Sequence, residues 1–361
     1  MREQLNPFAT SASTSPAEGM GGVSGVFKRP NIKKFKPEAE MRAEQLELVR
    51  RWRAHQVKWN PNENGGRLRP DKNDVEEYLK RRRGHAGTGM YGSEGAAFAE
   101  YMVLESLDAD GVLGGKNSVT EGHAYAYEPS DIDDILRGTD ALVMYSGLDE
   151  EHERLVYPVA VDVTLNPEEA QIKQMRDIQR LTGDNLNLAR LYWYDTKSEE
   201  AGLSFDEPGE GKVRALNTTV YIPGELAETF VNPNATSAKA AEALHRVGII
   251  TLDQQRWQLE LEALILTGGV RLDRSGGLRV TVNRPSRSEV LRNLAKLMKI
   301  GSAKMNDRTY AAQALSEILP TIWSASDVRP LSRTDQALIA GTRLTEDFDA
   351  LYPDISDAAA E

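Results

Sequence analysis

The sequence predicts a mixed α/β protein that continues into a mainly helical region. Between residues 91 and 228, segments with helix and strand patterns follow one another in the order α, β, β, β, α, β, β. After residue 229, helical patterns dominate. Of the 361 residues, 40% are hydrophobic and 27% are charged, which is the composition of a globular chain with a sizeable core. This composition excludes a collagen-like or wholly disordered chain.

The N-terminal part of the chain divides into a leader and a basic extension. Residues 1–25 are rich in Ser, Gly, Ala, Thr and Pro and lack periodicity, which predicts a disordered leader. Residues 26–90 are expected to form a basic helical extension, with helices over 37–57 and 73–83. Residues 28–83 hold 17 basic and 9 acidic residues, a net charge of +8, although the whole chain carries −11. A basic segment therefore precedes an acidic body.

The first domain is expected over residues 91–228. Its opening helix, over 93–107, has an apolar stripe at one-turn spacing, formed by Ala97, Tyr101, Leu104 and Leu107. A second helix, over 166–181, is indicated by Asn166 at its N-cap and Pro167 at its first position. Apolar and β-branched segments predict strands over 123–127, 139–145, 155–165, 188–195 and 213–224.

The second domain is expected over residues 236–350, after a boundary near 225–236. A Ser-Gly-Gly turn predicts a β-hairpin over 268–282, and an acidic tail follows over 351–361. Helical patterns predict helices over 236–247, 251–266, 286–300, 307–319 and 333–350.

Composition also excludes several classes of site and location. The chain has no cysteine, so cysteine zinc sites, iron–sulfur clusters, disulfides and cysteine nucleophiles are excluded. Its five histidines form no HxH or HxxxH pair, which argues against a histidine zinc site. No apolar run approaches the ~20 residues that span a bilayer, and residues 1–25 lack the apolar stretch of a secretory signal. We therefore expect a cytoplasmic protein without a membrane partner.

Asp162 is the most informative acidic residue of the first domain. It lies inside the apolar segment VAVDV, where alternation places Ala160, Asp162 and Thr164 on one face of the strand. Burying an ionised carboxylate without a partner costs several kcal/mol. Asp162 therefore either faces a partner, a metal ion or a cleft, or lies on a solvated face or caps the next helix.

Three short motifs in order resemble the PD-(D/E)XK nuclease superfamily, in particular its RecB-like group. They are Gly92-Ser93-Glu94 with Ala97 and Tyr101, then Gly138-Thr139-Asp140, then Val161-Asp162-Val163-Thr164. The resemblance covers roughly residues 91–195. It implies a restriction-endonuclease-like α-β-β-β-α-β core, with the basic extension before it and the helical domain after it.

The resemblance also implies a chemistry, the metal-dependent hydrolysis of nucleic-acid phosphodiesters. Asp140, Asp162 and the carbonyl group of Val163 would hold Mg²⁺ or Mn²⁺, hard cations that prefer oxygen ligands. Glu94 would be an outer ligand or would hold water. A helical glutamine that is typical of the RecB-like group corresponds to Gln171 or Gln174.

The sequence departs from this family at Thr164, where the motif has a lysine. Three interpretations stay open. Lys173 on the next helix could supply the cation, although a solvated surface lysine is the alternative for that residue. The site could also work without a lysine, or the fold could be kept for binding after catalysis was lost.

The basic extension is the predicted nucleic-acid contact, with DNA favoured over RNA. Its alternative role is to neutralise the acidic body or to complement a helix dipole. Three functions follow: an Mg²⁺-dependent nuclease, an inactive nuclease fold that binds nucleic acid or has a structural role, and an assembly protein. The C-terminal helices could bind a protein partner. The candidate nucleic-acid-binding residues are Lys33, Lys34, Lys36, Arg50, Arg51, Arg53, Arg81, Arg82 and Arg83.

Overall fold

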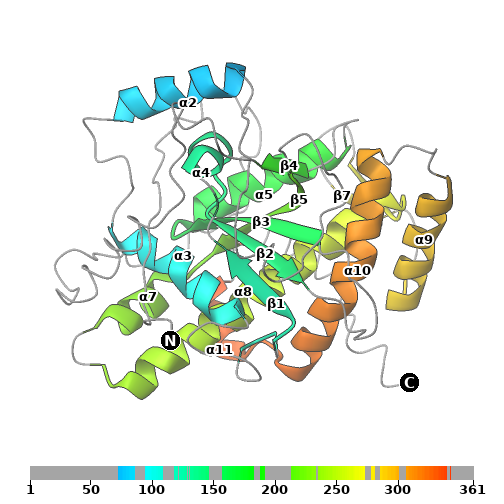
Figure 1. The fold of residues 1–361 in the computed structure, drawn as a ribbon. Helices are drawn as coiled ribbons and strands as arrows, with labels where there is room; N and C mark the ends of the chain where they lie inside the picture. Colours follow the sequence, from blue (N-terminus) through cyan, green and yellow to red (C-terminus); the bar gives the residue numbers. More distant parts are fainter. Residues whose placement is uncertain are drawn as a thin grey trace.

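Figure 1 shows the fold of the chain in a computed structural model. The predicted leader, the expected helix over 37–57 and the acidic tail lie outside the described residues. The structure describes residues 72–85, 94–108, 118–120, 122–127, 129, 131–145, 157–182, 188–191, 213–232, 235–272, 278–280, 285–300, 306–339 and 342.

The described chain is a mixed α/β fold that is mostly helical, as predicted. The helices are α2 (Lys72–His85), α3 (Glu94–Leu107), α4 (Asp131–Arg137), α5 (Pro167–Thr182), α7 (Gly224–Val231), α8 (Ser237–Leu266), α9 (Arg287–Ile300), α10 (Asp307–Val328) and α11 (Arg333–Ile339). The strands are β1 (Ala124–Tyr127), β2 (Ala141–Tyr145), β3 (Tyr157–Thr164), β4 (Leu188–Leu191), β5 (Val213–Tyr221), β6 (Val270–Leu272) and β7 (Leu278–Val280).

Five of the strands form one mixed sheet in the order β1-β2-β3-β5-β4. Strands β1, β2 and β3 are antiparallel neighbours, and β5 then lies parallel to β3 with Asp162 opposite Thr219. A parallel pair needs a crossover, which α5 supplies between the two strands. Strand β4 is an antiparallel edge strand on β5, and β6 and β7 form the predicted separate hairpin.

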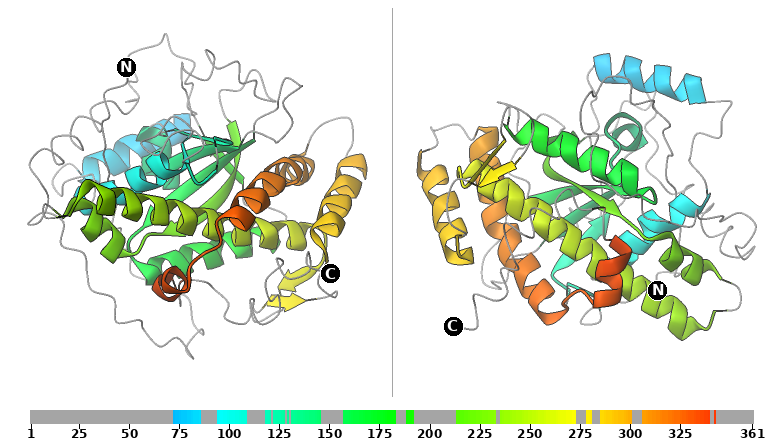
Figure 2. Two further views of the ribbon diagram at one scale, coloured as in Figure 1. Left: turned by 90° about the horizontal axis from the view of Figure 1, so that it is seen from below. Right: turned by 180° about the vertical axis from the view of Figure 1, so that it is seen from behind.

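Helices cover both faces of the five-stranded sheet, as the two views of Figure 2 show. Helices α3 and α10 contact one face of the sheet, where Val159, Val161 and Val163 join the main hydrophobic core. Helix α5 contacts the other face, toward which Asp162 points. Strand β3 is therefore buried along its whole length.

Helix α8 runs beside the sheet and contacts α3, α5, α7 and β5. Two of its glutamines, one helical turn apart, bond the backbone of β5 beyond the segment that pairs with β4. Gln258 accepts from the N–H of Thr219 at 2.9 Å and donates to its carbonyl at 2.8 Å. Gln254 does the same at Tyr221, at 3.0 Å and 2.8 Å. These amides take the hydrogen-bonding positions of a neighbouring strand.

Helix α8 corrects the prediction of two helices over 236–247 and 251–266, because it continues unbroken between them. Gly248 lies inside it, where a Cβ atom would be 2.8 Å from Val119 Cγ1 and 2.9 Å from Ser106 Cβ. The glycine therefore serves close packing against the end of α3, not a break in the helix. Residues of α8 and of the expected first domain belong to the same hydrophobic core cluster.

Other element boundaries differ from the prediction for local reasons. Helix α10 continues through Pro320 to Val328, because buried Ile318, Leu319, Ile322 and Trp323 hold both halves in the core. Helices α4 and α7 were not predicted. Helix α11 covers the start of the helix expected over 333–350, and only residue 342 is described beyond it. None of the described helices is long and apolar enough to cross a membrane.

Candidate active site

Asp140 is placed by the turn that joins α4 to β2. Gly138 lies in this turn with a φ of +64°, a left-handed conformation that favours glycine. The N–H of Asp140 donates to the carbonyl of Val161 at 2.8 Å, and the N–H of Val163 donates to Asp140 Oδ2 at 2.7 Å. Asp140 is thereby fixed against β3 from the turn that precedes β2.

Asp162 lies on β3 and faces α5. Its residue surface is only 5% exposed, so the alternative of a solvated sheet face is wrong. A buried carboxylate needs a compensating partner, and the helix that Asp162 faces must provide it.

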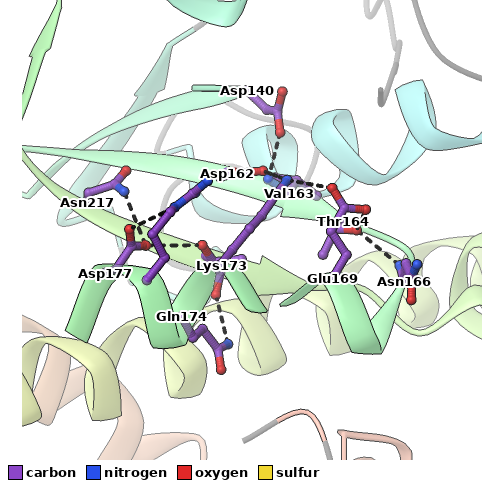
Figure 3. A network of polar contacts seen from close by, with 12 residues as sticks. Asp140, Asp162, Val163, Thr164, Asn166, Glu169, Lys173, Gln174, Asp177 and Asn217 are labelled. Atoms are coloured by element: carbon purple, nitrogen blue, oxygen red, sulfur yellow. Dashed lines mark hydrogen bonds and ion pairs between the residues drawn. The ribbon is translucent and has the colours of Figure 1, made fainter. Parts of the chain in front are cut away.

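Lys173 brings a cation to Asp162 from the second turn of α5. Its Nζ lies 2.6 Å from Asp162 Oδ1 and 3.0 Å from Glu169 Oε1. The lysine side chain is 16% exposed, so Lys173 is not the solvated surface residue of the alternative interpretation. Figure 3 shows Asp140, Asp162 and Lys173 converging from a turn, a strand and a helix.

Thr164, the residue at the motif-lysine position, joins the same network. Its hydroxyl donates to Glu169 Oε2 at 3.2 Å and accepts from the N–H of Asn166 at 3.1 Å. Asn166 in turn accepts the N–H of Glu168 at 3.1 Å, which caps the first turn of α5. The end of β3 and the start of α5 are thus connected through polar side chains.

Burial and charge shift the pKa values of this cluster. Burial, with the charges of Asp162 and Asp134, raises the pKa of Asp140 well above its usual range. Burial also raises the pKa of Asp162, although Lys173 opposes the shift. Burial lowers the pKa of Lys173, but Asp162, Asp140 and Glu169 outweigh it and the net shift is upward. Lys173 is therefore a cation among carboxylates.

The carboxylates of Asp140 and Asp162 are the residues that could hold a small divalent cation. Their oxygens are hard ligands, and their mutual repulsion would be relieved by a positive ion between them. Gly138 has no side chain to cover Asp162, since a Cβ atom there would lie 3.5 Å from Asp162 Oδ2. In the described part of the chain, no group of three or more His, Cys, Asp or Glu residues forms a metal cluster. The fit thus depends on this pair.

The other predicted site residues are placed less completely. Glu94 is the first residue of α3, and its side chain lies outside the part of the chain that the structure describes. Val163 contacts Asp140 through its N–H group. Of the two candidate glutamines, Gln174 donates to the carbonyl of Thr219 at 3.3 Å and so ties α5 to β5.

The predicted nucleic-acid-binding residues fall into two groups. Arg81, Arg82 and Arg83 lie on α2, where Arg81 contacts Glu77 and donates to the carbonyl of Ile135 at 3.1 Å. The side chains of Arg82 and Arg83 are not described. The remaining six residues lie outside the described ranges, namely Lys33, Lys34, Lys36, Arg50, Arg51 and Arg53.

Sequence reasoning missed two acidic residues on α5. Glu169 stands four residues before Lys173, a spacing that places the two side chains side by side on a helix and could have revealed the pair. Asp177 lies one turn beyond Lys173, and its Oδ2 accepts from the side-chain amide of Asn217 at 3.3 Å. This contact could not be predicted because it depends on which residues of β5 lie beside α5. Burial raises the pKa of Asp177 to about 6.

Comparisons with known proteins find no relative. No family model, no curated protein and no solved structure matches the chain.

Proposed function

We propose that the protein is a metal-dependent nuclease with a restriction-endonuclease-like core. This core would comprise α3, β1, β2, β3, α5 and β5, with β4 as an additional edge strand and α4 as an insertion. The antiparallel β1-β2-β3 order followed by a parallel β5 supports the assignment. So does the position of Asp140 before β2 and Asp162 within β3.

The contact between Lys173 Nζ and Asp162 Oδ1, at 2.6 Å, carries the proposal. The sequence lacks a lysine at position 164, and this contact supports its replacement from α5. A buried acid pair with an adjacent ammonium group is a suitable arrangement for phosphodiester hydrolysis. The acids would bind a metal ion, and the metal ion and the ammonium group would act together on one phosphate.

The residues would divide the chemistry between them. Asp140 and Asp162 would hold Mg²⁺ or Mn²⁺, which lowers the pKa of a bound water and neutralises charge on the phosphate when bound. Lys173 would place its ammonium group beside the scissile phosphate and stabilise the negative charge that develops there. Glu94, at the start of α3, would hold water near the phosphate.

The position of α2 supports nucleic acid as the substrate. This basic helix packs on α4, through Tyr78 against Ile132 and an ion pair of 2.8 Å between Arg137 and Asp74. Figure 1 shows α2 beside α4, which leads through Gly138 to Asp140. Cations on α2 would therefore contact a phosphate backbone on the same side as the acid pair.

A cleavage assay tests the proposal. Purified protein is incubated with labelled single- and double-stranded DNA and RNA, in Mg²⁺, in Mn²⁺ and in chelator. We expect metal-dependent cleavage, preferentially of DNA, that Asp162→Ala and Lys173→Met each reduce by about 100-fold or more. Lys239→Met, which changes an exposed lysine on α8, is the matched control and should retain wild-type activity.

The other outcomes of the assay separate the alternatives. Cleavage that persists in Asp162→Ala would exclude this site as its source. If the protein binds the labelled nucleic acids but cleaves them in neither Mg²⁺ nor Mn²⁺, the inactive nuclease fold would be favoured. Neither cleavage nor binding would favour an assembly role.

A further inference from the structure

We infer that Thr164 and Glu169 are positioning residues that hold the ammonium group of Lys173 at Asp162. In this interpretation Thr164 does not mark the loss of a catalytic cation. It is the first member of a hydrogen-bonded chain that secures a cation supplied by α5. The inference rests on the proposed function for its consequence in catalysis, but its geometry can be tested separately.

The chain of contacts has three steps. Thr164 Oγ1 donates to Glu169 Oε2 at 3.2 Å, and Glu169 Oε1 lies 3.0 Å from Lys173 Nζ. The same Nζ lies 2.6 Å from Asp162 Oδ1. The chain begins and ends on β3, since Asp162 and Thr164 are two residues apart and share one face of the strand.

The hydroxyl of Thr164 has its direction fixed by its two partners. A hydroxyl has one proton to donate, and Thr164 already accepts the N–H of Asn166 at 3.1 Å. Its proton is therefore available for Glu169. The carboxylate of Glu169 is in turn held by one contact on each oxygen.

Burial distinguishes this pair from an ordinary surface ion pair. Exposed Glu–Lys pairs one turn apart on a helix contribute only about 0.3–0.5 kcal/mol, because water competes and the side chains lose entropy. Here Lys173 is 16% exposed and Glu169 is 18% exposed. With water largely excluded, loss of Glu169 would leave the long lysine side chain held at one carboxylate only.

The test uses four single variants on α5 and β3. Glu169→Gln removes one charge from the chain, and Thr164→Val removes the hydroxyl donor while keeping the branched shape. Thr164→Ser keeps the donor and should behave like the wild type. Glu168→Gln is the matched control, because Glu168 is the exposed neighbour of Glu169 on the same helix.

Two measurements read the outcome. The first is the ¹⁵Nζ signal of Lys173, assigned by its loss in Lys173→Met, since an ammonium group held in hydrogen bonds exchanges its protons slowly. We expect this signal to broaden or vanish in Glu169→Gln and Thr164→Val, and to persist in Thr164→Ser and Glu168→Gln. The second is cleavage, where the first two variants should lose about 10- to 100-fold in kcat with little change in KM.

The two readouts separate the inference from the proposed function. An unchanged Lys173 signal in both Glu169→Gln and Thr164→Val would overturn the inference, whatever the activity. If the wild-type protein cleaves nothing but the Lys173 signal is lost in those variants, the positioning inference would stand and the proposed nuclease function would be refuted. Equal losses in Thr164→Ser and Thr164→Val would also contradict the inference, because they would show that the hydroxyl donor is not what matters.

Discussion

Asp177 shows how one residue can give the protein a pH-dependent stability. Its carboxyl group accepts from Asn217 and contacts Arg180 and Arg176, while Asp162 lies close enough to repel it. Burial is nevertheless the largest influence, and it raises the pKa from 3.8 to about 6. The folded protein therefore binds this proton more tightly than the unfolded chain does.

The sign of the effect follows from linkage. A carboxyl group with a raised pKa in the folded state stabilises the protein at low pH, and this contribution is lost as the pH rises from about 4 through about 6. We expect Asp177→Asn to flatten the decline in the free energy of unfolding across this window. Urea denaturation at several pH values measures the free energy of unfolding. Plots of this free energy against pH that run parallel for the wild type and Asp177→Asn would contradict the expectation.

Asp327 provides a control of opposite sign. Its contact with Arg287 lowers its pKa, so its contribution is present at higher pH and is lost as the pH falls. In the same urea experiment, Asp327→Asn should therefore destabilise the protein at every pH above about 4, and this effect should fade only as the pH falls below that value.

Part of the site could be predicted from single residues. The apolar neighbours of Asp162 indicated a partnered carboxylate as one of its alternatives, and the missing lysine at 164 made Lys173 one of the possible sources of a cation. The meeting of Asp140, Asp162 and Lys173 could not be derived from spacing, because it depends on how α5 packs across β3. The contact of Thr164 could not be predicted from the sequence, because a hydroxyl carries no charge and its bond to Glu169 depends on how α5 begins after β3.

At the scale of elements, helix α8 gives the clearest test of packing. Alanine normally favours a helix over glycine by about 1 kcal/mol. At Gly248, however, a Cβ atom would lie 2.8 Å from Val119 and 2.9 Å from Ser106. We expect Gly248→Ala to destabilise the protein by about 1–3 kcal/mol, because overpacking outweighs propensity.

The measurement for this prediction is thermal or urea unfolding. The reverse substitution Ala241→Gly, at an exposed position of the same helix, calibrates propensity alone and should cost about 1 kcal/mol. A Gly248→Ala protein more stable than the wild type would show that α8 and α3 separate easily.

Most elements of the core followed from local pattern, and the exceptions have physical causes. The cap of α5 at Asn166 and the apolar strands were predicted correctly because their signals lie within a few residues. Helix α4 was missed because it has only seven residues, too few for a periodic pattern. The interruption expected within α8 was wrong because a glycine can serve tertiary contact as well as termination.

At the scale of the whole molecule, charge is separated along the chain. Residues 28–83 carry a net charge of +8 in a protein of net charge −11. An acidic body repels a polyanion, so affinity for nucleic acid would depend on the basic extension. Arg82 and Arg83 belong to α2, the part of that extension that packs on α4.

The salt dependence of DNA binding tests whether affinity comes from the basic extension of this acidic protein. We expect the double variant Arg82→Glu/Arg83→Glu to bind DNA more weakly, with a log–log salt slope shallower by about 1 for each phosphate that the variant no longer neutralises. Lys296→Glu/Lys299→Glu on α9 changes the net charge equally at exposed positions and should alter the slope little. Equal changes in the two proteins would show that only total charge matters.

The two glutamines of α8 have a consequence for how separate molecules meet. A strand with open N–H and carbonyl groups invites another chain to add to the sheet, which leads to domain swapping or aggregation. Gln254 and Gln258 occupy those groups on β5 with side chains of their own molecule. A helix thereby occupies backbone groups of β5 that would otherwise be open to a strand of another molecule.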